Sequence, residues 1–176
     1  MNPSLTVPQS RNSIPSVRES KQQVLWIGCS DSSFEEITCL GLLLDETIVL
    51  RSIGNIFLDD GLTCLSMVQY AIGILQVKHV VVCGHYGCGL VKASSSAGLT
   101  DPWLSKLNAL RSACDGQLRG SLSVERDRRF VELNVLAQMQ SLQRVPEVAS
   151  AMGSRNMKIH GFVYDHSLSE MVRLDV

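Results

Sequence analysis

The stretch VVVCGHYGCG at residues 80–89 decides the fold of this chain. The three valines at 80–82 predict a short buried strand, because β-branched side chains favour the pleated backbone. Glycines beside His85 and Cys88 let the chain turn sharply where that strand ends. A histidine and a cysteine three residues apart at a strand end can point at one ion. The stretch is therefore interpreted as half of a zinc site, whose third ligand comes from elsewhere in the chain.

The composition predicts one soluble domain. The chain has 176 residues, of which 45% are hydrophobic and 19% charged, enough for a sizeable core. Its formal net charge of −1 gives no electrostatic reason to bind nucleic acid or an anionic membrane surface. Residues 125–129 alternate in charge, as is typical of a solvated helix face. No apolar run is long enough to span a bilayer, so we expect neither a nucleic-acid nor a membrane partner.

The six cysteines favour metal ligation together with buried free thiols. No apolar signal segment precedes them, so a disulfide framework is the weaker interpretation and a cytoplasmic location is expected. Residues 1–22 are polar, rich in serine and interrupted by three prolines, which predicts a flexible arm ahead of a domain at 23–176. The basic residues of this arm leave mitochondrial targeting open.

Short apolar runs alternate with helical patterns along the domain. The runs predict strands at 24–28, 46–50, 80–84 and 158–164 and an edge strand at 171–176. The helical patterns predict helices at 34–44, 60–75, from 101–102 onward and around 131–145, with loops at 94–98 and 116–120. Ser33 is expected to cap the first helix, and Asp59 or Asp60 the second. This alternation predicts an α/β fold: a single domain with a mostly parallel four- to five-stranded sheet covered by helices.

The ends of two predicted strands carry metal-ligand side chains. Cys29 follows the first strand, and His85 with Cys88 follows the third. The carboxyl ends of parallel strands meet at one edge of a sheet, where ligands bind, so the zinc is expected there. Two cysteines and one histidine leave a fourth tetrahedral position, which is typical of a catalytic zinc. Asp31 lies two residues after Cys29 and can reach the same space.

These motifs resemble those of the β-class carbonic anhydrases. The resemblance spans about residues 22–172 and rests on CSDS at 29–32, RSIGN at 51–55, CGHYGCG at 83–89, NVL at 134–136 and GFVYD at 161–165. It implies one zinc per chain on Cys29, His85 and Cys88, and reversible hydration of CO2 to bicarbonate. It also implies a homodimer or a dimer-based tetramer, with the backbone around Gly54 lining the CO2 pocket.

The chain departs from the family pattern at Ser33, where an arginine is usual. In similar enzymes that arginine pairs with the aspartate and holds it off the metal, and a serine hydroxyl is no substitute for a bidentate guanidinium. We therefore expect Asp31 to act as a fourth zinc ligand for much of the time and the enzyme to be slow. Arg51 is a candidate replacement partner for Asp31. Together with Gly54 and Ser33, it is also a candidate for the substrate pocket. A second departure is the short amino-terminal region, since similar proteins carry helices there that embrace the neighbouring subunit.

Several functions remain open from the sequence. In the open site, Asp31 would orient a zinc-activated water or accept its proton, and His79, His160 and His166 are candidate proton carriers. The alternative is a catalytically impaired zinc protein that serves as a bicarbonate-binding or structural subunit. Another linear substrate, such as carbon disulfide, is a third interpretation. A thiol redox protein is disfavoured, because the chain has no Cys-x-x-Cys pair.

Overall fold

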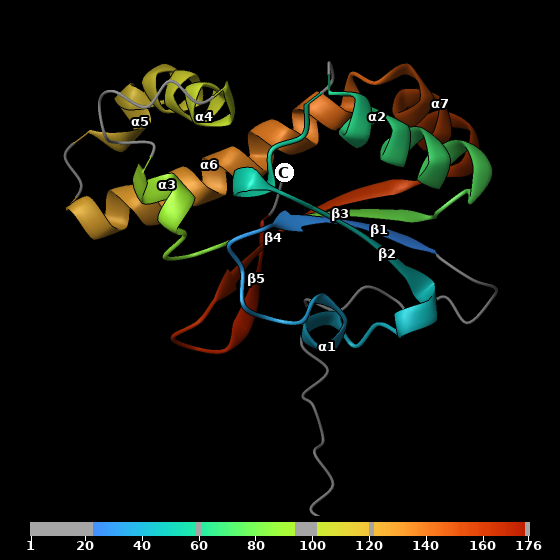
Figure 1. Cartoon of the computed structure of the whole chain (residues 1–176), viewed down its shortest axis with the longest axis horizontal. Coiled ribbons are helices and arrows are strands. Elements are labelled where there is room, and N and C mark those ends of the chain that lie inside the picture. Colours follow the sequence, from blue (N-terminus) through green and yellow to red (C-terminus); the bar gives the residue numbers. More distant parts are fainter. Residues whose placement is uncertain (1–22, 59–60, 94–101, 120–121, 175–176) are drawn as a thin grey trace, which may run out of the picture.

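The computed structural model describes residues 23–58, 61–93, 102–119 and 122–174. Its centre is a five-stranded sheet in the order β2-β1-β3-β4-β5 (Figure 1). The strands are β1 (Val24–Cys29), β2 (Thr47–Ser52), β3 (His79–His85), β4 (Lys158–Asp165) and β5 (Glu170–Leu174). β1 to β4 run parallel, and β5 pairs antiparallel with β4. The predicted mostly parallel sheet and its edge strand are confirmed.

The central strands are buried on both faces, as their continuous apolar runs predict. All six residues of β1 and the last six of β3 are buried. In the register of the sheet, Gly28 lies beside Cys83, so β1 and β3 end at the same edge. Residues that follow these two strands therefore emerge close together in space.

Helices cover the two faces of the sheet unequally. One face carries α2 (Leu62–Gln69), α6 (Ser123–Gln143) and α7 (Pro146–Arg155), and the other carries α1 (Glu36–Leu40) (Figure 1). The remaining helices are α3 (Gly89–Ala93), α4 (Pro102–Ala113) and α5 (Asp115–Leu118). Two 3-10 turns, η1 (Leu44–Glu46) and η2 (Ile53–Asn55), flank β2, and α2 continues as a π-helical turn, η3 (Tyr70–Ile74). Among the helices of the described residues, none combines the length and apolar character needed to cross a membrane.

The long helix α6 approaches the sheet closely because two strand residues are glycines. A Cβ atom at Gly84 would lie 3.0 Å from side-chain carbons of both Val131 and Val135. A Cβ atom at Gly161 would lie 2.6 Å from Sδ of Met139. The sequence of β3 and β4 therefore fixes how near α6 can come to the carboxyl ends of the strands.

Three sequence-based expectations about helices are wrong. The helix predicted at 34–44 is only α1, and its amino end is capped at Glu35 with no side-chain hydrogen bond, so Ser33 does not cap it. Gly61, not Asp59 or Asp60, occupies the cap position of α2. The loop predicted at 116–120 is partly helical, in α5. The expected arm at 1–22 and the loop at 94–98 lie outside the described residues.

A side chain from a neighbouring strand holds the segment before α1. Arg51 of β2 donates hydrogen bonds to the carbonyl oxygens of Ser32 and Phe34. These bonds tie the turn after β1 to β2. The helix begins two residues after Phe34 and ends at Gly41, which has a left-handed φ of 65°.

Candidate metal centre

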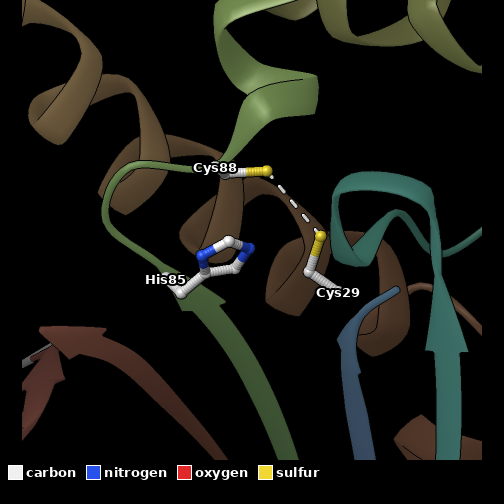
Figure 2. Close-up of side chains that lie close together, drawn as sticks. All are labelled: Cys29, His85 and Cys88. Atoms are coloured by element: carbon white, nitrogen blue, oxygen red, sulfur yellow. Dashed lines mark hydrogen bonds between the residues drawn. The ribbon is translucent and has the colours of Figure 1, made fainter. Parts of the chain in front are cut away.

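Two cysteines and a histidine converge at the carboxyl ends of β1 and β3. Cys29 is the last residue of β1, His85 is the last of β3, and Cys88 lies in the turn that leads to α3 (Figure 2). Their ligand atoms all lie within 4.8 Å of one another, and all three residues are buried. The structure thus brings together the three residues that the sequence singled out as metal ligands.

The geometry of this cluster fits a zinc ion. The two sulfur atoms are 3.7 Å apart. Two thiolates bound to zinc at about 2.3 Å with a tetrahedral angle would be separated by about 3.8 Å. A disulfide would place them at about 2.05 Å, and all six cysteines are free thiols. Both ring nitrogens of His85 are buried without a hydrogen-bond partner, as expected of a side chain prepared for a metal.

The hydrogen bond between the two thiols shifts their pKa values in opposite directions. The hydrogen bond from Cys88 lowers the pKa of Cys29 to about 4, against the opposing effect of burial and with help from His85 and the backbone N–H of Asp31. The same hydrogen bond, together with burial and the charge on Cys29, raises the pKa of Cys88. One thiolate therefore forms readily, and the second requires a bound cation to balance its charge.

Asp31 lies at the rim of the cluster. Its Oδ2 accepts a hydrogen bond from the backbone N–H of Gly89 at 2.7 Å and is 4.0 Å from Nε2 of His85. A Cβ atom at residue 89 would be 3.3 Å from Oδ2, so the glycine lets the carboxylate approach. The Asp31 side chain is 43% exposed and thus borders both solvent and the cluster. The expected proximity is present, and the role of Asp31 as a ligand remains a prediction.

Arg51 holds the turn after β1 and does not pair with Asp31. Its guanidinium donates to three backbone carbonyls and one hydroxyl of that turn, at Cys29, Ser32 and Phe34. It also forms an ion pair with Glu36, whose side chain is 10% exposed. The idea that Arg51 replaces the absent partner of Asp31 is therefore wrong, because these acceptors occupy its guanidinium.

The other two predicted pocket residues have different surroundings. Ser33 is exposed, and its side chain makes no hydrogen bond with any residue that the structure describes. Gly54 is buried in η2 with a left-handed φ of 61°, and its carbonyl accepts a hydrogen bond from Asn134 Nδ2 at 2.8 Å. Ser33 therefore gives Asp31 no support, and α6 fixes the position of Gly54.

The candidate proton carriers lie at opposite ends of the sheet. The ring of His166 packs against that of His85, with the two centroids 5.6 Å apart, and its side chain is exposed. His79 and His160 lie at the amino ends of β3 and β4 and contact each other instead. Of the three, only His166 lies beside the candidate metal ligands.

Sequence reasoning missed three contacts that shape the site. The Gly89 N–H bond to Asp31 and the pairing of Glu36 with Arg51 were not foreseen. Arg128, interpreted as part of a solvated face, pairs with the buried Asp165 at 2.7 Å and stacks on Tyr86. Hydrogen bonds from Ser167 and Arg128 lower the pKa of Asp165 to about 2. Only the glycine beside Cys88 offered a local signal for any of these contacts.

A family model described as carbonic anhydrase matches residues 24–171 of the chain. The match covers strands β1 to β4, the start of β5, and the cluster of Cys29, His85 and Cys88. The chain belongs to the β-class carbonic anhydrase family. Curated relatives named carbonic anhydrase include one from Emericella nidulans, 35% identical over 81% of this chain, and one from Candida albicans, 32% identical over 86%.

Solved β-carbonic anhydrases share the fold over nearly the whole chain. CafD of the filamentous fungus Aspergillus fumigatus is 43% identical with a TM-score of 0.83, and the match covers 94% of this chain and 96% of that one. A tetrameric β-carbonic anhydrase of Sordaria macrospora is 31% identical with a TM-score of 0.83, over 90% of this chain and 83% of that one. This chain covers only 65% of the Emericella relative and 56% of the Candida relative.

Proposed function

We propose that the chain is a zinc-dependent enzyme that interconverts CO2 and bicarbonate. The observation that carries this proposal is the buried set of two thiols and one imidazole, with zinc-compatible spacing, at the carboxyl ends of β1 and β3. Membership of the β-carbonic anhydrase family supports the choice of reaction. Zinc held by Cys29, His85 and Cys88 supplies a Lewis acid that activates water near neutral pH.

Asp31 has two roles in this proposal, and they compete. Its carboxylate lies within reach of the cluster, where it orients water and accepts a proton. The same carboxylate is a good zinc ligand, and its Oδ2 is held by one neutral N–H donor rather than by a cation. We infer that Asp31 occupies the fourth zinc position for much of the time, so the enzyme is weak at neutral pH.

The arrangement of Arg51 supports weak activity independently. The guanidinium of Arg51, the expected replacement partner of Asp31, is bonded to the turn after β1 and to Glu36. Ser33 carries no charge and makes no hydrogen bond with Asp31. No described residue therefore pairs a cation with the Asp31 carboxylate, other than the cluster's own His85 at 4.0 Å.

Stopped-flow CO2 hydration by protein of known zinc content, from mildly acidic to alkaline pH, tests the proposal. We expect slow hydration at pH 7 that rises at alkaline pH, as hydroxide displaces Asp31. The variant Ser33→Arg restores a charge-assisted bond and is expected to raise the rate at pH 7 by about tenfold or more. Ser33→Gln matches the added length without the charge and is expected to leave the rate unchanged. Fast hydration at pH 7 by the unaltered chain would refute the closed-site hypothesis.

A second function is favoured by the same missing cation. In this alternative the chain is a catalytically impaired zinc protein that binds bicarbonate or completes an oligomer. It predicts no hydration at any pH, even with about one zinc per chain and with Ser33→Arg in place. Bicarbonate binding by the zinc-loaded chain, measured by calorimetry, then distinguishes a binding subunit from a purely structural one.

We also propose a homodimer or a dimer-based tetramer. The related Sordaria macrospora enzyme is described as tetrameric. This chain exposes large apolar side chains that a partner subunit would cover, among them Leu62, Ile74, Leu122 and Val124. Light scattering at low protein concentration tests the proposal, and a monomer at micromolar concentration contradicts it.

A further inference from the structure

A pair of histidines lies at the opposite end of the sheet from the metal cluster. His79 is the first residue of β3, and His160 is the third of β4. Nδ1 of His79 is 3.0 Å from Nε2 of His160, a hydrogen-bond distance between two residues 81 positions apart in sequence. Parallel pairing of β3 with β4 places both side chains on the face of the sheet that carries Phe162. No step of the proposed reaction uses this pair.

Arg173 of β5 fixes the direction of the hydrogen bonds in the pair. Its guanidinium lies 3.2 Å from Nδ1 of His160 and can only donate, so that nitrogen is the acceptor. In a neutral imidazole the other nitrogen then carries the hydrogen, and Nε2 of His160 donates to Nδ1 of His79. By the same reasoning, Nε2 of His79 carries a hydrogen. This outward donor makes no hydrogen bond within the described residues.

Within the part of the chain that the structure describes, the charged side chains that act on the pair are basic. Lys158 pairs with His79 in the register of β3 and β4, on the same face of the sheet, and Lys78 directly precedes His79. Neither lysine nor Arg173 forms an ion pair with an acidic side chain among the described residues, and none has an unstated partner. The lysines and the arginine are exposed, whereas His160 is 6% exposed. The cluster therefore combines a buried histidine, His160, with three exposed positive charges that no described acidic side chain pairs with.

The titration of both histidines reflects this environment. Burial, together with repulsion from His79, Arg173 and Lys158, lowers the pKa of His160 to about 4. Burial also lowers the pKa of His79, with added repulsion from Lys158 and Lys78. Gln23, the residue before β1, is neutral, and its backbone carbonyl accepts a hydrogen bond from the N–H of His79. Among the described residues, no acidic side chain forms an ion pair with these cations, so an anion would relieve the repulsion.

We propose that His79, Lys158, His160 and Arg173 form a binding site for a phosphate group, with Lys78 adding charge. The guanidinium of Arg173 offers a fork to two oxygens, Lys158 offers a point charge, and Nε2 of His79 offers a directed hydrogen bond. Two negative charges on the ligand match the surplus of cations better than the single charge of bicarbonate. A metal ion is disfavoured, because an arginine and two lysines repel it.

This site is separate from the metal cluster. His79 and His85 are the two ends of the seven-residue strand β3, which spans about 20 Å. Phosphate bound at one end therefore does not contact ligands at the other. The site takes either inorganic phosphate or the phosphate of a monoester, since both present the same oxyanion.

The histidine ring signals of the zinc-loaded protein, observed by NMR in chloride buffer, test the proposal directly. We expect inorganic phosphate to shift the ring nitrogens of His79 and His160 with saturation in the millimolar range or below. The variants Lys158→Gln and Arg173→Gln are each expected to weaken binding by about fivefold or more. Lys106→Gln, an exposed lysine of α4, is the matched control and is expected to change the affinity less than about twofold. Lys158 forms no ion pair within the described ranges, so its variant stays informative if Arg173→Gln impairs folding.

Sulfate remains a dianion between pH 5.5 and 8, so any change in its affinity over this range reports a change in the charge of the protein and not of the ligand. Sulfate is expected to bind more tightly as pH falls, since protonation of His79 adds a positive charge. A parallel titration with adenosine monophosphate distinguishes the sources: tighter binding than inorganic phosphate indicates a phosphate ester, and equal binding indicates free phosphate. The proposal is overturned if about 20 mM phosphate leaves both histidines unmoved, or if Lys158→Gln binds as well as the unaltered chain.

Discussion

Strand β3 presents a histidine at each end, and the two ends of the sheet have opposite chemistry. At the carboxyl end, His85 lies beside two thiols and its ring nitrogens have no partner. At the amino end, His79 lies beside His160, which takes a hydrogen bond from Arg173. The same residue type on one strand thus belongs to a cation site at one end and to a basic cluster at the other. The neighbouring residues from β1, β4 and β5 decide which kind of ion each histidine is suited to bind.

The largest effect is expected from removing a thiol at the carboxyl end. Cys88→Ser replaces a thiolate ligand with a poor donor, so zinc content should fall from about one per chain to below about a tenth. CO2 hydration should fall with it, beyond detection. Cys83→Ala is the matched control, because Cys83 lies in β3, before the turn that holds Cys88, and its thiol donates a hydrogen bond to the Gly84 carbonyl. Metal analysis measures both, and equal zinc in the two variants would contradict the assignment of Cys88.

The carboxyl end should also be intolerant of small changes in volume. Gly84→Ala forces a methyl group within 3.0 Å of Val131 and Val135 and should lower the free energy of unfolding by about 2 kcal/mol. Gly153→Ala in α7 is the control, since its added Cβ meets nothing within 4 Å and should stabilise the helix by about 0.5–1 kcal/mol. Urea unfolding of the zinc-loaded protein measures both changes. A neutral effect of Gly84→Ala would mean that α6 is free to shift away from β3.

At the amino end of the sheet, His160 should make the free energy of unfolding depend on pH. His160 has a folded pKa of about 4, below its unfolded value, so the unfolded chain binds more protons between the two values. Stability should therefore decrease as pH falls, by about 1 kcal/mol from His160 between pH 6.5 and 5.5. Urea unfolding at these two pH values should show the loss in the unaltered chain and a smaller loss in His160→Gln. Equal losses in both would mean that His160 is charged in the folded protein.

The smallest effect is expected from removing a lysine at the amino end of the sheet, where it should change the free energy of unfolding only slightly. Lys158→Gln removes a cation that only repels its neighbours, so it should raise the free energy of unfolding by about 0.3 kcal/mol at low ionic strength. The gain should vanish at 1 M salt, where charges are screened within about 3 Å. Lys106→Gln in α4 is the control, and urea midpoints at the two salt concentrations measure both. A loss of stability in Lys158→Gln would show that this lysine has a structural partner.

The parts of this fold that the sequence predicted are those encoded over a few neighbouring residues. Continuous apolar runs identified β1, β3 and β4, and the ligands followed because Cys29 and His85 come at strand ends. Helix α7 was missed because the predicted helix around 131–145 ends before Pro146 and no helix was predicted after it. In the structure Pro146 is the first residue of the next helix, where its fixed φ and missing N–H carry no cost.

The unpredicted parts depend on contacts between distant residues. Arg51 and Glu36 meet only because β2 lies beside β1. Arg128 has the charge pattern of a solvated helix, and its buried partner Asp165 is 37 residues away. The basic cluster at the amino end requires the order β3-β4-β5, which strand patterns alone do not specify.

The hydrogen bonds from Arg51 to the turn after β1 affect which substitutions this protein can accept during evolution. That turn keeps its shape through a side chain from β2 and through backbone carbonyls, and neither depends on the identity of residue 33. Ser33 is exposed and outside this network, so its replacement leaves the ligand-bearing loop intact. If residue 33 sets the catalytic rate as proposed, selection can adjust that rate without a penalty in folding, and a slow and a fast enzyme differ by one substitution on the same scaffold.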